Sequence, residues 1–164
     1  MNPVPDDMAM AGLIEKLSAK LLQSGLRLAT AESCTGGWIA KCCTDRAGSS
    51  AWFERGFVTY SNEAKHELLG VDAQVLEFAG AVSEAVAMQM ASGAANHSNA
   101  DVSLAVTGIA GPDGGTDDKP VGTVWFGWSV DGSVTTECKR FPGSRDDVRR
   151  QTVAHAVSEL IGRL

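Results

Sequence analysis

The sequence predicts an α/β fold of three layers, in which helices cover both faces of a mixed, mostly parallel sheet that ends in an antiparallel hairpin. Helical and strand-like segments alternate through the first part of the chain, which is typical of strands joined by crossover helices. Two strand-like runs near the end, 121–130 and 133–141, flank Asp131-Gly132. An Asp-Gly pair between such runs is a strong hairpin signal.

In the first half of the chain, apolar residues recur at helical spacing over 6–23, and Ser24-Gly25 is a typical helix end. Ser61 or Asn62 can cap a later helix, which should stop at Gly70. The expected elements, in chain order, are a helix at 6–23, a strand at 26–30, a helix at 36–43, a strand at 54–60 and a helix at 61–70.

In the second half, Gly80 ends a short helix and Ser83 caps a longer one. The last helix starts near 143–147, and its inner face is predicted to contain Val148, Val153, Val157, Leu160 and Ile161. The expected elements here are a short helix at 72–78, a helix at 83–94, a buried strand at 101–107, the hairpin and the final helix.

The chain has 164 residues, which fits one domain over 1–164, with 1–7 as a flexible leader. The formal net charge of −6 argues against a general affinity for nucleic acid. No stretch is apolar for long enough to span a membrane, and the leader has no secretory pattern. These features predict a soluble, cytoplasmic protein with no membrane partner.

The cysteines show neither zinc-finger spacing nor a disulfide pattern, so free thiols are expected. Three acidic residues share the loop after the 101–107 strand, but their spacing matches no calcium-binding loop and favours a solvated loop. The cysteines are Cys34, Cys42, Cys43 and Cys138, and the acidic residues are Asp113, Asp117 and Asp118.

Two predicted strands open onto loops of small residues, 33–37 and 107–115. Ligands of open α/β sheets bind beyond the carboxyl ends of the strands, so we expect these loops to share a pocket. The helix that follows the first loop offers free N–H groups to an oxyanion, a phosphate or a carboxylate. The alternative is that a hydroxyl caps this helix and the glycines permit the turn. Neither loop matches a nucleoside triphosphate or dinucleotide fingerprint.

Ser33, Cys34 and Thr35 are possible nucleophiles or hydrogen-bond donors, and Lys65 is a candidate base. A helix N-terminus and partial burial would lower the pKa of Lys65 and make it a general base for Ser33, unless it is a solvated surface lysine. Cys34 is a rival nucleophile or a small buried thiol. The three histidines lie outside nucleophile motifs. Arg145 either holds an anion or pairs with a neighbouring aspartate on the surface.

Four ordered segments resemble the CinA C-terminal domain family, and the likeness extends over about 8–162. They are 31–37 (A-E-S-C-T-G-G), 56–65 (G-F-V-T-Y-S-N-E-A-K), 81–84 (A-V-S-E) and 106–115 (V-T-G-I-A-G-P-D-G-G). The resemblance implies a stand-alone amidohydrolase domain that converts nicotinamide mononucleotide to nicotinate mononucleotide and ammonia in pyridine nucleotide recycling. It also implies a homodimer or larger homo-oligomer, and neither a metal nor another cofactor is expected.

The resemblance further implies roles for individual residues. Ser33 is the expected nucleophile and Lys65 its base, while Tyr60 and Thr107 orient this pair or the substrate. The remaining expected substrate-binding residues are Thr35, Gly36 and Gly37, whose amides would stabilise the oxyanion, and Gly108, Gly111 or Arg145, which would hold the phosphate.

Two other functions are compatible with this sequence. A non-catalytic nucleotide-binding or competence-related regulatory module could use the same anion pocket. It would not need a nucleophile beside a base, however. A nucleic-acid-interacting competence or repair factor is disfavoured by the acidic charge.

Overall fold

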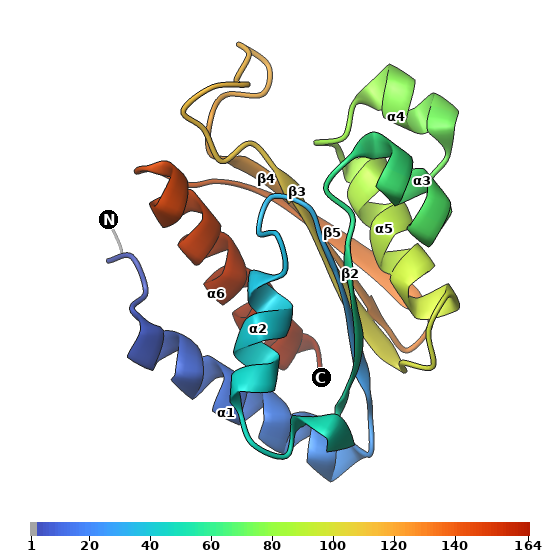
Figure 1. Cartoon of the computed structure of the whole chain (residues 1–164), viewed down its shortest axis with the longest axis vertical. Coiled ribbons are helices and arrows are strands. Elements are labelled where there is room, and N and C mark those ends of the chain that lie inside the picture. The colour runs from blue at the N-terminus through green and yellow to red at the C-terminus, as the bar shows by residue number, and fades with distance from the viewer. Residues whose placement is uncertain (1–2) are drawn as a thin grey trace.

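The computed structural model describes residues 3–164 and contains a five-stranded sheet in the order β2-β1-β3-β4-β5 (Figure 1). Its strands are β1 (Leu28–Glu32), β2 (Phe53–Val58), β3 (Val102–Gly108), β4 (Thr123–Val130) and β5 (Ser133–Arg140). β1 pairs in parallel with both β2 and β3, whereas β4 pairs antiparallel with β3 and β5. Only β4 therefore runs against the other strands, and the predicted mixed, mostly parallel sheet is confirmed.

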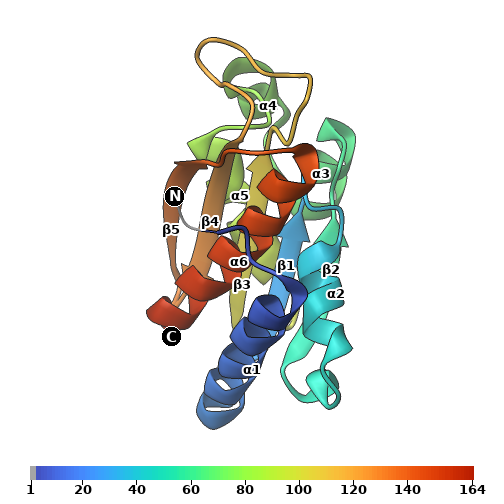
Figure 2. The same cartoon turned by 90° about the vertical axis from the view of Figure 1, so that its left-hand side faces the viewer.

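Helices cover both faces of the sheet, which confirms the predicted three layers (Figures 1 and 2). One face carries α1 (Asp7–Ser24), α2 (Trp38–Asp45) and α6 (Arg145–Arg163). The other carries α3 (Asn62–Leu69), α4 (Ala73–Ala79) and α5 (Glu84–Asn96). A single turn of 3₁₀ helix, η1 (Ser49–Ala51), precedes β2.

Local sequence signals explain most element boundaries. Ser61 caps α3 by accepting from the N–H of Ala64 at 3.0 Å, and Gly70 ends that helix with a left-handed φ of 69°. Asp131 and Gly132 both have positive φ, 52° and 76°, as a type I′ hairpin turn requires. The hairpin predicted from the Asp-Gly pair is confirmed.

Strand ends differ by one or two residues from the predicted ones, and the shifts in β1 and β2 affect the site. β1 lies two residues later than expected, because its pairing with β2 and β3 continues to Glu32. β2 ends at Val58 rather than at residue 60. The carbonyls of Thr59 and Tyr60 are consequently outside the sheet ladder and available to a side chain.

The core consists of two clusters, one on each face of the sheet. The cluster under α1, α2 and α6 is built from large side chains, including Leu17, Leu104 and Phe126. The cluster under α3, α4 and α5 is rich in alanine, with Met90 and Leu69 as its larger members. Burial of these side chains supplies most of the driving force for folding and fixes the strand ends that carry the site.

The N-terminal segment departs from the predicted leader. Asp6 accepts from the N–H of Ala9 at 2.8 Å and caps α1, and Asp7 is the first residue of that helix. Part of the predicted leader, residues 1–2, lies outside the described residues. Among residues 3–164, no helix combines the length and the apolar character needed to cross a bilayer.

Candidate active site

The candidate site is a cleft of about 270 Å³ beyond the carboxyl ends of β1 and β3. Ser33 follows β1 directly, Thr107 lies near the end of β3, and Lys65 is the fourth residue of α3. The cleft is lined by Ser33, Cys34, Tyr60, Asn62, Lys65, Ala81, Val82, Thr107, Gly108, Ala110 and Arg145. The two loops predicted to share a pocket therefore do so.

The amine of Lys65 and the hydroxyl of Ser33 are in direct contact. Lys65 Nζ lies 3.0 Å from Ser33 Oγ, and it also lies 3.0 Å from Thr59 O and 3.2 Å from Tyr60 O. A neutral amine has two N–H donors and one lone pair. If the donors serve the two carbonyls, the lone pair is directed at the hydroxyl hydrogen of Ser33, as a general base requires.

The surroundings of Lys65 favour its neutral form. Its side chain is 1% exposed, and desolvation lowers the pKa of the amine below its ordinary value. No carboxylate forms an ion pair with Lys65 within residues 3–164. The reading of Lys65 as a solvated surface lysine is thus wrong, because α3 turns it into the protein.

Cys34 does not have the properties of a rival nucleophile. Burial raises the pKa of its thiol to about 12, which opposes the thiolate form needed for attack. Desolvation opposes the lowering expected from a helix N-terminus, so the structure favours the other sequence-based alternative, a small buried thiol. Cys34 instead packs into the core cluster under α1, α2 and α6.

The histidines are engaged away from Ser33. His66 Nδ1 contacts Val71 O at 2.8 Å, and His97 Nδ1 contacts Gly93 O at 2.8 Å. His155 Nε2, on α6, lies 2.8 Å from a carboxylate oxygen of Glu137 on β5. Lys65 is therefore the base available to Ser33 in the described chain.

Glu32 occupies the helix N-terminus that the sequence suggested for a bound anion. Its carboxylate accepts from Thr35 Oγ1 at 2.6 Å, from Ile39 N at 2.8 Å and from Ala40 N at 3.1 Å. The side chain is 1% exposed, and burial raises the pKa of the carboxyl group despite these bonds. The protein thus supplies the anion for the start of α2 itself.

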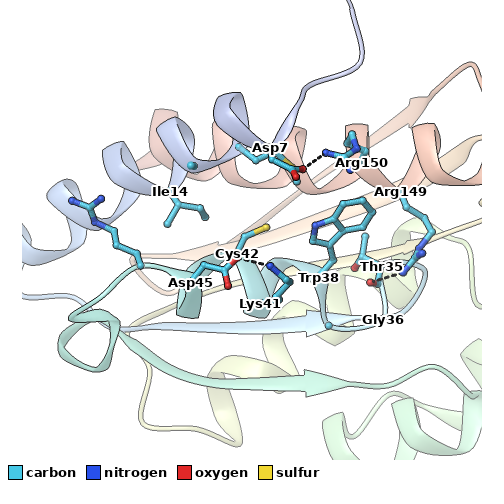
Figure 3. Close-up of a pocket in the computed structure, with 14 residues that line it drawn as sticks. Asp7, Ile14, Thr35, Gly36, Trp38, Lys41, Cys42, Asp45, Arg149 and Arg150 are labelled. Carbon is cyan, nitrogen blue, oxygen red and sulfur yellow. Dashed lines mark hydrogen bonds and ion pairs between the residues drawn. The ribbon is translucent and has the colours of Figure 1, made fainter.

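The glycines of this turn face another part of the molecule. The N–H of Gly36 donates to Ser33 O at 3.1 Å and is not free for an oxyanion. Thr35, Gly36 and Gly37 line a separate cavity of about 690 Å³ among α1, α2 and α6 (Figure 3). The N–H of Gly37 is directed at the Glu32 carboxylate, and neither glycine lines the cleft. The expectation that the Thr35, Gly36 and Gly37 amides together form the oxyanion site must be corrected for Gly36 and Gly37.

Tyr60 and Thr107 both line the cleft, but neither hydroxyl bonds to the Ser33–Lys65 pair that these residues were expected to orient. Tyr60 contributes its backbone carbonyl to Lys65, while its side chain is 64% exposed. Thr107 Oγ1 donates to Ala81 O at 2.9 Å and so ties β3 to the segment before α5. Neither hydroxyl is within hydrogen-bond distance of Ser33 Oγ or Lys65 Nζ.

Arg145 and the glycine loop form one wall of the cleft. Arg145 Nη1 donates to Gly111 O at 2.7 Å, and Gly108 is the last residue of β3. The two alternatives for phosphate binding, the 108–111 loop and Arg145, are therefore neighbours. The sequence-based alternative of a surface pair between Arg145 and an aspartate is not found among residues 3–164.

In the part of the chain that the structure describes, no three His, Cys, Asp or Glu side chains lie close enough together to hold a metal ion. Asp113, Asp117 and Asp118 are all exposed in the long loop after β3. The free thiols expected from the cysteine spacing are also found.

A family model described as the CinA C-terminal domain matches residues 10–164. The chain belongs to this family. It is 52% identical over 157 residues to the nicotinamide-nucleotide amidohydrolase PncC of Escherichia coli K12, with 94% of each chain covered. It is also 54% identical over 142 residues to a CinA-like protein of Geobacter sulfurreducens, covering 87% of this chain and 34% of that protein.

Solved structures of the CinA family share the whole fold. A CinA superfamily protein from Escherichia coli matches with a TM-score of 0.94 at 40% identity, covering 99% of this chain and 95% of the other. The competence/damage inducible protein CihA of Agrobacterium tumefaciens matches with a TM-score of 0.92 at 44% identity, covering 99% and 98%. The α/β architecture described above is thus the architecture of the family.

The sequence did not single out three contributors to the site's geometry: Glu32, the carbonyl of Thr59, and Arg149. Glu32 carried a usable signal, because it is a charged residue at the end of an otherwise apolar strand, three positions before a hydroxyl. Arg149 carried none, because its partners in the nucleophile loop are more than a hundred positions away.

Proposed function

We propose that this chain is a nicotinamide-nucleotide amidohydrolase, which converts nicotinamide mononucleotide to nicotinate mononucleotide and ammonia. The similarity to proteins named for this reaction, at 52% identity over 94% of both chains, supports the substrate. The observation that carries the chemistry is the 3.0 Å contact between Ser33 Oγ and the buried amine of Lys65. Such serine–lysine pairs replace the serine–histidine pair in some acyl-transfer enzymes.

In the proposed first step, neutral Lys65 takes the proton from Ser33 Oγ while the oxygen attacks the carboxamide carbon. The tetrahedral intermediate then collapses, and the Lys65 ammonium gives its proton to the departing nitrogen, which leaves as ammonia. Ser33 is left as an ester of the nicotinate group. Neutral Lys65 next deprotonates a water molecule that attacks this ester, and the proton returns to Ser33 Oγ as nicotinate mononucleotide departs.

The carbonyls around Lys65 suit this proton transfer. When Lys65 gains the serine proton, its third N–H points back at the serine oxygen while Thr59 O and Tyr60 O keep the other two. The amine therefore changes charge without a change of position. This preorganisation avoids a reorganisation cost in the transition state.

The walls of the cleft suggest how the mononucleotide binds. Arg145 and the 108–111 loop, joined at Gly111 O, are placed to hold the phosphate, since a guanidinium binds phosphate oxygens in pairs. The Tyr60 ring, exposed at the mouth, offers a flat apolar face to the pyridine ring. Thr107 holds Ala81, another lining residue of the cleft, through its bond to Ala81 O.

A homodimeric or larger assembly and a cytoplasmic location remain part of the proposal, on the strength of the sequence resemblance. Light scattering coupled to size-exclusion chromatography tests the assembly. A non-catalytic binding module is the weaker alternative, since burial of a lysine without a counter-ion costs free energy and brings a binding module no advantage.

The experiment that tests the proposal measures ammonia release when the purified protein is incubated with nicotinamide mononucleotide. Chromatography should show nicotinate mononucleotide in equal amount. Free nicotinamide and nicotinamide riboside serve as comparison substrates that lack the phosphate, and both should be poorer. If no ammonia forms from any of the three amides, the amidohydrolase function is rejected.

A further inference from the structure

The side chain of Arg149 reaches from α6 to the loop that carries Ser33. Arg149 Nε donates to Cys34 O at 3.0 Å, and Arg149 Nη2 donates to Thr35 O at 3.1 Å. Figure 3 shows the guanidinium beside Thr35 and Gly36, with the ring of Trp38 next to it. One planar cation thus holds two consecutive carbonyls directly after the proposed nucleophile.

These contacts fix the directions of several amide N–H groups. In a trans peptide, C=O and N–H point in opposite directions. The hydrogen bond from Arg149 to Cys34 O therefore directs the N–H of Thr35 away from Arg149. The hydrogen bond from Arg149 to Thr35 O likewise fixes the direction of the N–H of Gly36, which donates to Ser33 O at 3.1 Å. The bond from Gly36 to Ser33 O in turn fixes the orientation of the peptide unit that contains Ser33 O and the N–H of Cys34.

The amides of Cys34 and Thr35 are the donors left for an oxyanion. No oxygen within residues 3–164 accepts a hydrogen bond from either of them. The other amides of this segment are directed elsewhere. Those of Gly37, Ile39 and Ala40 point at the Glu32 carboxylate, and that of Ser33 donates to Val106 O. Buried amides without partners are uncommon, and near a nucleophile they are typical of an oxyanion hole.

We propose that Arg149 is a positioning residue of the reaction, which holds the loop so that the amides of Cys34 and Thr35 meet the oxyanion that forms on the carbon attached to Ser33 Oγ. The inference rests on the proposed function, because it takes Ser33 as the nucleophile. The guanidinium also polarises the peptide between Cys34 and Thr35, which makes the N–H of Thr35 a better donor.

The charge of Arg149 is directed at this loop rather than at an acid. Among the described residues, no carboxylate forms an ion pair with Arg149. Its neighbour Arg150 packs on the same Trp38 ring, 4.9 Å from the centroid against 5.4 Å for Arg149, but pairs with Asp7 and Asp146. Arg150 makes no hydrogen bond to the Ser33 loop, so it is a matched control.

The test compares Arg149→Lys and Arg149→Ala with Arg150→Lys and Arg150→Ala in two measurements. The first is kcat and KM for nicotinamide mononucleotide. The second is the rate at which a fluorophosphonate probe labels Ser33, followed by mass spectrometry, because the phosphonyl oxygen of the probe occupies the oxyanion position. Thermal melting of all four variants separates effects on folding from effects on the reaction.

We expect both Arg149 variants to lose about 10- to 100-fold in kcat and in labelling rate, with KM nearly unchanged, since removing one oxyanion donor outright costs roughly 100- to 1,000-fold. The Arg150 variants should stay near the unaltered rates. Guanidinium ions at millimolar concentration should restore part of the labelling rate of Arg149→Ala, because the vacated space adjoins the cavity of about 690 Å³. They should not accelerate Arg150→Ala.

The positioning role is overturned if Ser33 is labelled at the unaltered rate in Arg149→Lys. It is also overturned if the Arg149 and Arg150 variants lose labelling rate by similar factors that follow their loss of melting temperature. Failure of the unaltered protein to react at Ser33 would reject the proposed nucleophile, and the role of Arg149 with it. Labelling of Ser33 that is indifferent to Arg149 would reject the further inference alone.

Discussion

Lys65 Nζ lies 3.0 Å from Ser33 Oγ, although the two residues are 32 positions apart. Ser33 leads into α2 on one face of the sheet, whereas Lys65 lies in α3 on the other face. The contact exists because β1 ends at Glu32 and β2, its parallel neighbour, ends at Val58, so the segments that follow them meet. Ser61 then caps α3 and turns Lys65 inward. A hydroxyl and a desolvated amine are thereby held together by backbone geometry.

The proposed base predicts how the rate depends on pH. Burial lowers the pKa of Lys65, and catalysis requires its deprotonated form, so activity should rise as pH rises through a pKa below the ordinary lysine value. The logarithm of kcat/KM should climb with a slope of about 1 on the acidic side of that pKa. A rate that is flat across the same range, with substrate charge unchanged, would contradict this account.

Lys65→Arg separates proton transfer from hydrogen bonding. Arginine keeps N–H donors for the carbonyls of Thr59 and Tyr60 but does not give up its proton near neutral pH. We expect a loss of about 100- to 10,000-fold in kcat, as for removal of a general base. Folding is checked by circular dichroism, and retention of more than a tenth of the activity would rule out Lys65 as the base.

Cys34→Ala tests the neighbouring candidate nucleophile. Since burial raises the pKa of this thiol to about 12, the thiolate is scarce at neutral pH, and kcat/KM should stay within about threefold of the unaltered value. Iodoacetamide should likewise inactivate the protein slowly. Complete loss of activity in a folded Cys34→Ala protein would return the nucleophile role to the thiol.

Glu32→Gln is expected to destabilise the protein. Three donors converge on the carboxylate, and an amide would place its own NH₂ group against one of them and leave a buried donor unsatisfied. The free energy of unfolding should fall by about 1–3 kcal/mol in urea titrations. Glu15→Gln, at an exposed position on α1, is the control and should change it by less than about 0.5 kcal/mol.

Arg145→Gln addresses the phosphate. Loss of a charge-assisted bond should raise KM for nicotinamide mononucleotide by roughly 10- to 100-fold while leaving kcat within a fewfold. The same substitution should barely affect hydrolysis of nicotinamide riboside, which has no phosphate. An equal effect on both substrates would assign Arg145 to another part of the site.

The fold was largely predictable from sequence, because its signals are local. Alternating helical and strand-like segments predicted the three layers, and Asp131-Gly132 predicted the hairpin. Strand ends were less predictable, since β1 extends to Glu32 only through pairing with two distant strands. Pairing energy depends on neighbours that local propensity does not contain.

The candidate site was predictable in its chemistry but not in its supports. Ser33 and Lys65 stand in short segments with recognisable residue types, and the rule that ligands bind beyond strand ends places their loops together. Two of the three amides assigned to the oxyanion have other partners, because the N–H of Gly36 donates to Ser33 O and that of Gly37 is directed at Glu32. Neither contact was anticipated. The hydrogen bond from Arg149 to Cys34 O joins residues 115 positions apart, and no sequence pattern encodes such a contact.

The most direct test of the central claim, that Ser33 is the nucleophile of an amidohydrolase, is ammonia release from nicotinamide mononucleotide by Ser33→Ala. Alanine removes one oxygen and leaves the backbone bonds of Ser33 N and O in place. The account predicts a fall in kcat of at least about 1,000-fold without loss of thermal stability. Activity within tenfold of the unaltered protein would contradict it.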